Sequence, residues 1–290
     1  MSGIIASGTM PSALVVLGAA GAIGAGVVDA ALESGRAVVA VGLDAAAHEA
    51  LRARHPAARL VVADAAITSD AAAAALAAGL REGGIVVDGV VASLAGTHRC
   101  GRLIDEPADL LRRTLDQDLL PHLFAARHLL PLLRHDSGGY VLVGGAGGRY
   151  PWAGYGHCSI AAAALRMMAR VLNDEAGRQG QRVQLLSIDA PVRAGATEEA
   201  LALGRRALSM LEGASRGGAA IVDYAAPMTS QVIANAQPPA ASSSPVPGRV
   251  APAAAAAAAV PGRRDLRAAR ALLAAIASPM PPGSFQDEYC

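Results

Sequence analysis

The sequence predicts a doubly wound α/β fold, in which a parallel sheet is covered by helices on both faces. Short apolar runs rich in β-branched residues alternate with longer helical segments through much of the 290-residue chain. A glycine-rich turn, Gly18 to Gly24, joins the first apolar run to the first helical segment. Only 3% of the residues are aromatic, so Ala and Gly are expected to form the helix–sheet contacts. Because strands that alternate with helices are joined by right-handed crossovers, we expect a Rossmann-like sheet.

Strands are predicted at the short apolar runs, and helices where apolar residues recur with helical spacing. Gly35 ends the first helix, and Pro121 is expected to bend the fourth one because proline has no N–H for the Gln117 carbonyl. The predicted strands are 13–17, 37–41, 59–63, 84–92, 140–143 and 182–188, and the predicted helices are 25–34, 45–53, 69–78, 107–134, 159–178 and 196–212.

Four regions are predicted along the chain. Residues 1–191 form the sheet-bearing domain, and residues 192–236 continue it as a substrate lid over the carboxyl ends of the strands. Residues 237–262 are largely Pro, Ala, Ser and Gly, with seven consecutive alanines, which is typical of a linker. Residues 263–290 contain a helix and a tail, and the helix has Leu266, Ala269, Leu272, Leu273 and Ile276 on one face.

The charge balance argues against nucleic acid and anionic membranes as partners. The chain has 25 basic and 24 acidic residues, a formal charge of +1, and every basic residue is arginine. The first 28 residues carry no charge but have no basic flank, and Pro11 and several glycines interrupt them, so we predict no membrane span.

The cysteines and histidines predict neither a disulfide framework nor a metal site. Cys100, Cys158 and Cys290 lie far apart without a CxxC pair, which favours a reducing cytoplasm. No two of the seven histidines stand four residues apart, so the spacing typical of a helical zinc site is absent.

Gly18, Gly21 and Gly24 form a GxxGxxG pattern between the first strand and the first helix. Small residues there let the backbone approach a pyrophosphate, whose charge the amino end of a helix stabilises. The alternative is close strand–helix packing in a glycine-rich chain. The position of the motif in the first βαβ unit favours a dinucleotide.

The end of the second strand carries Gly42, Leu43 and Asp44, where an acidic residue would bind the ribose hydroxyls of NAD. Gly42 has no carboxylate to repel a 2′-phosphate, so we favour NADP(H) over NAD(H). Arg36 and Arg52 are nearby cations that could assist, and the alternative is that either is simply a solvated surface residue. Asp44 is alternatively the N-cap of the next helix.

Further motifs follow at later strand ends. Asp64 follows the third strand, Ser93-Leu94-Ala95-Gly96 follows the fourth, and the segment from Cys158 to Val183 reads as a helix and a strand. These features resemble the adenine-contacting Asp, the Asn-Asn-Ala-Gly turn and the Tyr-x-x-x-Lys helix of the short-chain dehydrogenase/reductase family. The resemblance implies cofactor contacts at Gly18, Ala20, Gly21, Ala22, Ile23, Gly24, Gly42, Leu43, Asp44, Asp64, Ala65, Ala95 and Gly96.

In this register the catalytic residues of the family are replaced. The tyrosine falls on Cys158, the lysine on Ala162, the serine on Gly145 and the helix asparagine on Asp118. Choosing Tyr155 as the tyrosine breaks the downstream register, and no choice supplies a lysine because the chain has none.

The remaining polar candidates near the site are Ser93, Tyr155 and His157. Ser93 could donate to a carbonyl or simply close its turn, and His157 could donate a proton or lie at the surface. Tyr155 without a lysine should remain a phenol. Cys158 could ionise at a helix amino end or pack as a small buried thiol.

The resemblance implies an NAD(P)H-dependent ketoreductase that transfers hydride without the usual acid. Losing a general acid slows such a reaction without forbidding it. An aromatic polyketide whose carbonyl is hydrogen-bonded to its own peri-hydroxyl would lose least, with the proton coming from that hydroxyl or from water. The atypical ketoreductases of angucycline antibiotic pathways, such as the simocyclinone ketoreductase, are the family members that this pattern most resembles.

The alternative is a pseudoenzyme that binds a dinucleotide and acts as a redox sensor or partner subunit. An enzyme for flat aromatic substrates should line its cleft with Trp152, Tyr155, Met167 and Met210. The family also implies a homodimer, formed through the helices at 107–134 and 159–178; a monomer is the alternative, if the C-terminal segment covers these helices.

Overall fold

The computed structural model describes residues 12–96, 98, 100–134, 138–145, 147–188, 197–212 and 218–224. The chain divides into two units, Met1–Ser230 and Gln231–Cys290, and the second lies entirely outside the described residues. The predicted linker at 237–262 and the predicted helix and tail at 263–290 therefore also lie outside them.

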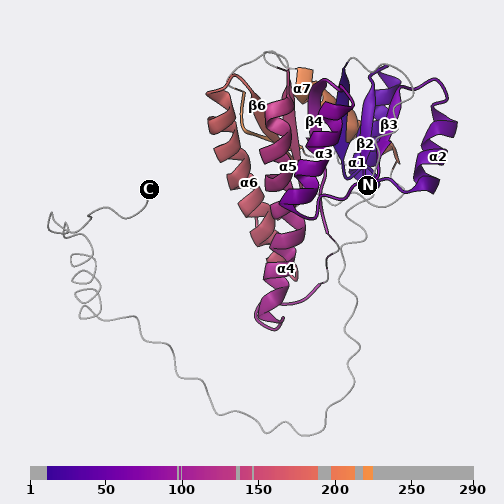
Figure 1. The fold of residues 1–290 in the computed structure, drawn as a ribbon. Helices are drawn as coiled ribbons and strands as arrows, with labels where there is room; N and C mark the ends of the chain where they lie inside the picture. The colour runs from indigo at the N-terminus through magenta and orange to yellow at the C-terminus, as the bar shows by residue number, and fades with distance from the viewer. Residues whose placement is uncertain are drawn as a thin grey trace, which may run out of the picture. The chain divides into compact units, whose positions relative to one another are not determined.

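The doubly wound α/β fold is confirmed. A parallel sheet of seven strands has the order β3-β2-β1-β4-β5-β6-β7, so the chain returns to the middle of the sheet after β3 (Figure 1). The strands are β1 Ala13–Leu17, β2 Val38–Val41, β3 Leu60–Ala63, β4 Val87–Ala92, β5 Gly139–Gly144, β6 Arg182–Ile188 and β7 Ile221–Tyr224.

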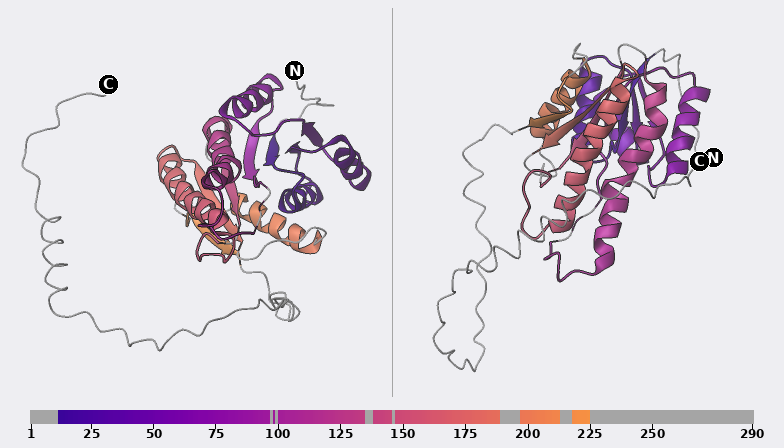
Figure 2. Two further views of the ribbon diagram at one scale, coloured as in Figure 1. Left: turned by 90° about the horizontal axis from the view of Figure 1, so that it is seen from below. Right: turned by 90° about the vertical axis from the view of Figure 1, so that its left-hand side faces the viewer.

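Helices form a layer on each face of the sheet, as Figure 2 shows. Helices α1, α2 and α7 contribute to one hydrophobic core, while α3, α5 and α6 contribute to the other. The helices are α1 Ala22–Glu33, α2 Ala45–Arg54, α3 Asp70–Glu82, α4 Ala108–Asp118, α5 Leu120–Leu129, α6 Gly156–Gly177 and α7 Thr197–Glu212, with the short 3₁₀ helix η1 at Leu130–Leu132.

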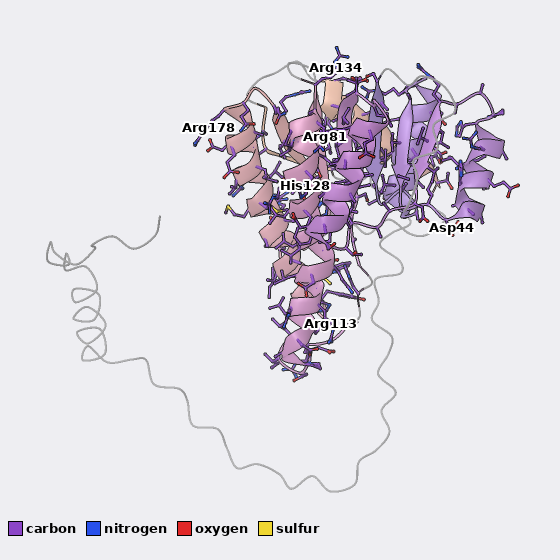
Figure 3. The ribbon with its side chains drawn as sticks, viewed as in Figure 1. Asp44, Arg81, Arg113, His128, Arg134 and Arg178 are labelled. Carbon is purple, nitrogen blue, oxygen red and sulfur yellow. The ribbon has the colours of Figure 1, made fainter. Side chains whose placement is uncertain are left out.

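The strands are continuous apolar runs because both faces of the sheet are buried. In β1, Val15 and Leu17 pack into one core, and Leu14 and Val16 pack into the other. The carboxyl ends of the strands lie at the lower edge of the sheet in Figure 1. Figure 3 shows Asp44, just after β2, at that edge, and Arg134, just before β5, at the opposite one.

The long helix predicted at 107–134 is interrupted. Helix α4 ends at Asp118, α5 begins at Leu120, and Leu119 between them has φ −111° and ψ −56°. Pro121 lies in the first turn of α5 and lacks the N–H that would have continued α4, so the expected bend occurs here. Asp118 thereby becomes the last residue of a helix.

The lid predicted at 192–236 is wrong for the described part of that range. Helix α7 packs along α1 on a face of the sheet, and β7 extends the sheet beside β6. The contact between α1 and α7 is close because each contributes a glycine: a Cβ on Gly204 would lie 2.2 Å from the Gly26 carbonyl oxygen. Sequence periodicity identified the helix but not the layer to which it belongs.

Within the described ranges, no helix has both the length and the apolar composition needed to cross a bilayer.

We predict that Gly204→Ala lowers the free energy of unfolding by about 1–3 kcal/mol, because the added methyl group must push α7 away from α1. Urea denaturation measures this. The matched control is Gly177→Ala, at the exposed end of α6, where a Cβ would meet nothing within 4 Å. That variant should be unchanged or more stable by up to about 1 kcal/mol, and equal losses in both variants would contradict the packing argument.

Candidate functional site

Two cavities lie at the carboxyl edge of the sheet, one on each side of the loop that follows β4. The first, which we call the β2 cavity, has a volume of about 470 Å³. Its walls include Gly42, Ala65 and Gly96. The second, the β5 cavity, measures about 180 Å³ and is lined by Val143, Cys158 and other residues. Leu94 and Ala95 line both cavities, which therefore adjoin each other.

The glycine turn after β1 contributes to both cavities, through Gly18 in the β2 cavity and Ile23 in the β5 cavity. Gly18 has φ +73°, and a Cβ there would lie 2.0 Å from the Ser93 carbonyl oxygen. A Cβ on Gly24 would lie 2.1 Å from the Gly18 carbonyl oxygen. Close packing therefore requires glycine at both positions.

Gly21 differs from the other two glycines of the motif. Its backbone angles, φ −70° and ψ 155°, suit any residue, and a Cβ would come no closer than 3.4 Å to another part of the protein. Gly21 is the N-cap of α1 and provides no side-chain hydrogen bond to the first turn. Ala20, Gly21 and Ala22 are exposed, so the amino end of α1 is accessible to an anion.

At the end of β2, only Gly42 of the three predicted ribose contacts lines the β2 cavity. Leu43 is buried in the hydrophobic core. Asp44 is the N-cap of α2, and its Oδ1 accepts a hydrogen bond of 2.7 Å from the Ala47 N–H. The N-cap alternative for Asp44 is confirmed, and its carboxylate is engaged by its own helix.

The predicted assistance from Arg36 and Arg52 is wrong. Arg36 precedes β2 and pairs with Glu212 at 3.8 Å, while Arg52 donates to the Leu60 carbonyl at the start of β3. Both guanidinium groups therefore lie toward the amino ends of the strands, at the edge opposite the two cavities.

The residues after β3 and β4 lie at the carboxyl edge, as the sequence predicted. Asp64 is exposed, and its neighbour Ala65 lines the β2 cavity together with Ala95 and Gly96. Ser93 is half-buried, and its N–H donates to the Leu17 carbonyl oxygen at 3.0 Å. This backbone bond joins the ends of β1 and β4, and both roles predicted for the Ser93 hydroxyl stay predictions.

The β5 cavity brings together Gly145, Cys158 and Ala162. A Cβ on Gly145 would meet nothing within 4 Å, so packing does not impose glycine at that position. The rest of the wall is mostly apolar, including Ile23, Val143, Trp152, Leu165 and Ile188. Gly145, Cys158 and Ala162 thus present a hydrogen atom, a thiol and a methyl group, respectively, to an apolar cavity.

An ion pair at the same cavity escaped sequence analysis. His98 lies on the connection from β4 to α4, and its Nε2 is 3.1 Å from Oδ2 of Asp118. The other carboxylate oxygen, Oδ1, accepts a hydrogen bond of 2.7 Å from the Gly96 N–H. His98 and Asp118 both line the β5 cavity.

The electrostatic environment keeps the Cys158 thiol protonated. Burial, and after it the nearby Asp118 carboxylate, raise the pKa of Cys158 to about 11. The structure therefore contradicts a thiolate at this position and supports the small packed thiol. Burial also raises the pKa of Asp118, against the lowering effects of the Gly96 N–H and of the charges on His98 and His157.

The other polar candidates do not line either cavity. His157 is buried, and neither ring nitrogen has a hydrogen-bond partner among the described residues, so the predicted surface position is wrong. Tyr155 stacks on Trp152, with ring centroids 4.8 Å apart. Of the four residues expected around an aromatic substrate, Trp152 lines the β5 cavity, whereas Met167 is exposed on α6 and Met210 is buried on the core-facing side of α7.

In the described part of the chain, no group of three or more His, Cys, Asp or Glu side chains is arranged to hold a metal ion.

Comparison with known proteins agrees with this architecture. A family model described as enoyl-(acyl carrier protein) reductase matches residues 18–216. The chain belongs to the short-chain dehydrogenase/reductase family. The search of curated proteins found no match.

Solved structures of this family share the fold at low sequence identity. An NADPH-bound short-chain oxidoreductase from Pseudomonas aeruginosa, described as containing an atypical catalytic center, is 23% identical and has a TM-score of 0.65, over 73% of this chain and 94% of that one. A short-chain dehydrogenase from Burkholderia cenocepacia in complex with NADP is 19% identical, with a TM-score of 0.62, over 73% and 95%. One from Mycobacterium smegmatis is 18% identical, with a TM-score of 0.64, over 78% and 97%.

His122 supports the wall that the two cavities of this short-chain dehydrogenase/reductase share. It is fully buried on α5, and its Nε2 lies 3.0 Å from the Leu94 carbonyl oxygen, so Nε2 carries the donated proton. Burial lowers the pKa of His122 to about 4. The imidazole is therefore neutral in the folded protein above that pH.

We predict that His122 makes stability fall as the pH drops from about 6.5 to about 4. In this window the unfolded chain takes up a proton that the folded chain does not, so protonation favours unfolding. Urea unfolding at a series of pH values measures the effect. His122→Gln keeps a donor for Leu94 but has no such titration, and it should have a smaller slope there. An unchanged slope in that variant would contradict the assignment.

Proposed function

We propose that this chain is an NAD(P)H-dependent ketoreductase that reduces a carbonyl group of an aromatic, polyketide-like compound. The observation that carries the proposal is the pair of adjoining cavities at the carboxyl edge, where β1 and β4 are neighbours. In doubly wound sheets, ligands bind at this kind of switch point. The family is one of oxidoreductases, and the mostly apolar β5 cavity accords with a hydrophobic substrate.

The residues around the β2 cavity fit the adenosine half of a dinucleotide. Gly42, Ala65 and Ala95 leave room in a cavity of 470 Å³, and the accessible amino end of α1 suits the pyrophosphate. We favour NADP(H) over NAD(H), because Gly42 has no carboxylate and Asp44 is held by its own helix. The NADPH and NADP complexes of two family members support the same choice.

When bound, the reduced nicotinamide supplies a hydride to the carbonyl carbon. The apolar residues of the β5 cavity would orient the substrate, so that positioning contributes much of the rate. The family's tyrosine and lysine are replaced by Cys158 and Ala162, and the Cys158 thiol is too weak an acid to donate readily. The proton would come from a hydroxyl of the substrate or from water, and a ketone with a peri-hydroxyl group needs the least help.

The entrance to the β5 cavity suits a flat ring. Trp152 lines the cavity, is partly exposed and carries Tyr155 stacked against it. A further hollow of about 280 Å³ shares Trp152 and Gly145 with the β5 cavity and is also lined by Tyr150. These aromatic residues offer stacking surfaces to a substrate larger than the β5 cavity itself.

A homodimer is part of the proposal. Ile160, Met167 and Val171 are exposed on one face of α6, with exposed fractions of 40%, 56% and 47%. An apolar face of this kind favours contact with a second copy of the chain.

The proposed function is tested by titrating the purified protein with NADPH and NADH, and by following the loss of reduced-nicotinamide absorbance with peri-hydroxy aromatic ketones. We expect tighter binding of NADPH and measurable turnover. Tyr155→Phe should retain it, without the ~10²-fold loss that follows removal of a general acid. Binding without turnover of any ketone would favour the sensor, and the absence of binding would contradict both functions.

We also predict that Ala95→Leu weakens NADPH binding at least about tenfold, a cost of about 1.4 kcal/mol. Ala95 is exposed at the wall shared by the two cavities, so a larger side chain would occupy ligand space without disturbing the core. Calorimetric titration measures the affinity, and urea unfolding checks the fold. Ala46→Leu on the exposed face of α2 is the matched control. Equal affinities for the two variants would argue against this binding site.

A further inference from the structure

The His98–Asp118 pair combines a charged hydrogen bond with access to both the β5 cavity and solvent. The side chains are 28% and 13% exposed, and both line the cavity beside Cys158. His98 can therefore contact a bound ligand and exchange protons with water. The less exposed Asp118 lies behind it as a fixed partner.

The position of Asp118 is set by the backbone rather than by the pair itself. Asp118 ends α4 where Pro121 interrupts the helix, and Oδ1 accepts the Gly96 N–H at 2.7 Å. A Cβ on Gly96 would lie 2.5 Å from Oε1 of Gln117, so glycine lets the loop come this close to the helix end. The second oxygen, Oδ2, is left to orient the imidazole.

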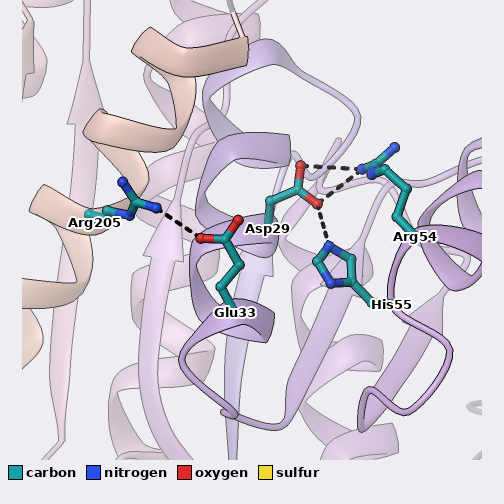
Figure 4. Close-up of polar contacts among 5 residues, drawn as sticks. All are labelled: Asp29, Glu33, Arg54, His55 and Arg205. Atoms are coloured by element: carbon teal, nitrogen blue, oxygen red, sulfur yellow. Dashed lines mark hydrogen bonds and ion pairs between the residues drawn. The ribbon is translucent and has the colours of Figure 1, made fainter.

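Another His–Asp pair among the described residues, His55–Asp29, is structural by comparison. His55 lies 3.0 Å from Asp29, which also pairs with Arg54, and these groups join α1 to the end of α2 (Figure 4). Neither His55 nor Asp29 lines the β2 or β5 cavity. The His98–Asp118 pair is distinguished by its place in the cavity wall, beside the positions aligned with the family's catalytic residues.

We propose that His98 is the general acid of the reduction and that Asp118 is its positioning residue. This inference rests on the proposed function and identifies the group that delivers the proton when the substrate has no hydroxyl to supply it.

In the reduction, a C–H bond of the reduced nicotinamide would break and its hydride would form a C–H bond at the carbonyl carbon. The C–O π bond would break, and its electron pair would go to oxygen. Because Nε2 of His98 is engaged by Asp118, an N–H bond at Nδ1 of the imidazolium breaks while an O–H bond forms. The products are the alcohol, the oxidised nicotinamide and a neutral imidazole, which regains a proton from solvent.

The titratable groups that act on Asp118 come from two elements. They are His98 on the β4–α4 connection, and His157 and Cys158 in the first turn of α6. Cys158 stays a neutral thiol and adds no charge beside the carboxylate. A reduction that needs protonated His98 should slow as the pH rises, because the donor is then lost.

The test compares 1-tetralone with 8-hydroxy-1-tetralone, which differ only in a hydroxyl group peri to the carbonyl. In His98→Gln, kcat for 1-tetralone should fall by about 10²-fold or more, the usual contribution of a general acid. For the hydroxy compound it should fall much less, because that substrate carries its own donor. The alkaline decline of kcat for 1-tetralone should also disappear, while NADPH affinity stays unchanged.

Asp118→Asn retains the acceptor for the Gly96 N–H, so the fold should persist while the charged partner of His98 is lost. The double variant that combines Asp118→Asn with His98→Gln should have a kcat for 1-tetralone no lower than that of His98→Gln alone, because the two residues act as one unit. Imidazole NMR of the cofactor-free protein provides a readout independent of turnover. The His98 ring signals should shift in Asp118→Asn and should not shift in the matched control, Asp29→Asn.

The inference is overturned if the wild type reduces both ketones and His98→Gln reduces them at the same rates with the same pH profile. It is also overturned if His98 signals are insensitive to Asp118→Asn. A wild type that binds NADPH but reduces no ketone instead refutes the proposed function, and with it the role of His98 that rests on it. His55→Gln, which removes a comparable pair outside the two cavities, should leave turnover unchanged.

Discussion

The close approach of the β1–α1 turn to the end of β4 is the contact on which the site depends. Gly18 lies so near the Ser93 carbonyl that a Cβ there would be 2.0 Å away, and Gly24 lies equally close to the Gly18 carbonyl. The absence of side chains lets α1 begin directly beside the loop after β4. Leu94 and Ala95 on that loop then separate the β2 cavity from the β5 cavity. Backbone packing therefore creates the space that a dinucleotide would occupy.

The break between α4 and α5 adds the polar part of the site. A continuous helix would satisfy its backbone internally, but the proline ends α4 at Asp118, and the carboxylate accepts the Gly96 N–H. His122, in the first turn of α5, holds the Leu94 carbonyl from the other side of the break. The same interruption thus anchors both ends of the Leu94–Gly96 segment and leaves one oxygen of Asp118 for His98.

The position of a residue relative to the end of a strand predicts several features of the site. The same rule shows that Arg36 lies away from it, since a residue that precedes a strand lies at the opposite edge. Gly42 follows from the rule that ligands of doubly wound sheets bind at the carboxyl ends of strands, whereas Ala65, Ala95 and Gly96 were implied by the family resemblance. No local sequence rule identifies His98, because its partner Asp118 is distant in the sequence and no motif spacing connects the two residues.

The sequence by itself determined the helices and six of the seven described strands in their order, and it missed β7, because strand and helix periodicities are local and the buried parallel strands are continuous apolar runs. It also determined that no lysine can serve at the site, since the chain has none. Only the tertiary structure decided that α7 packs on α1 instead of covering the cavities, that Met210 is buried, and that His98 meets Asp118. These outcomes depend on which surfaces meet in space, and a one-dimensional pattern does not specify those pairings.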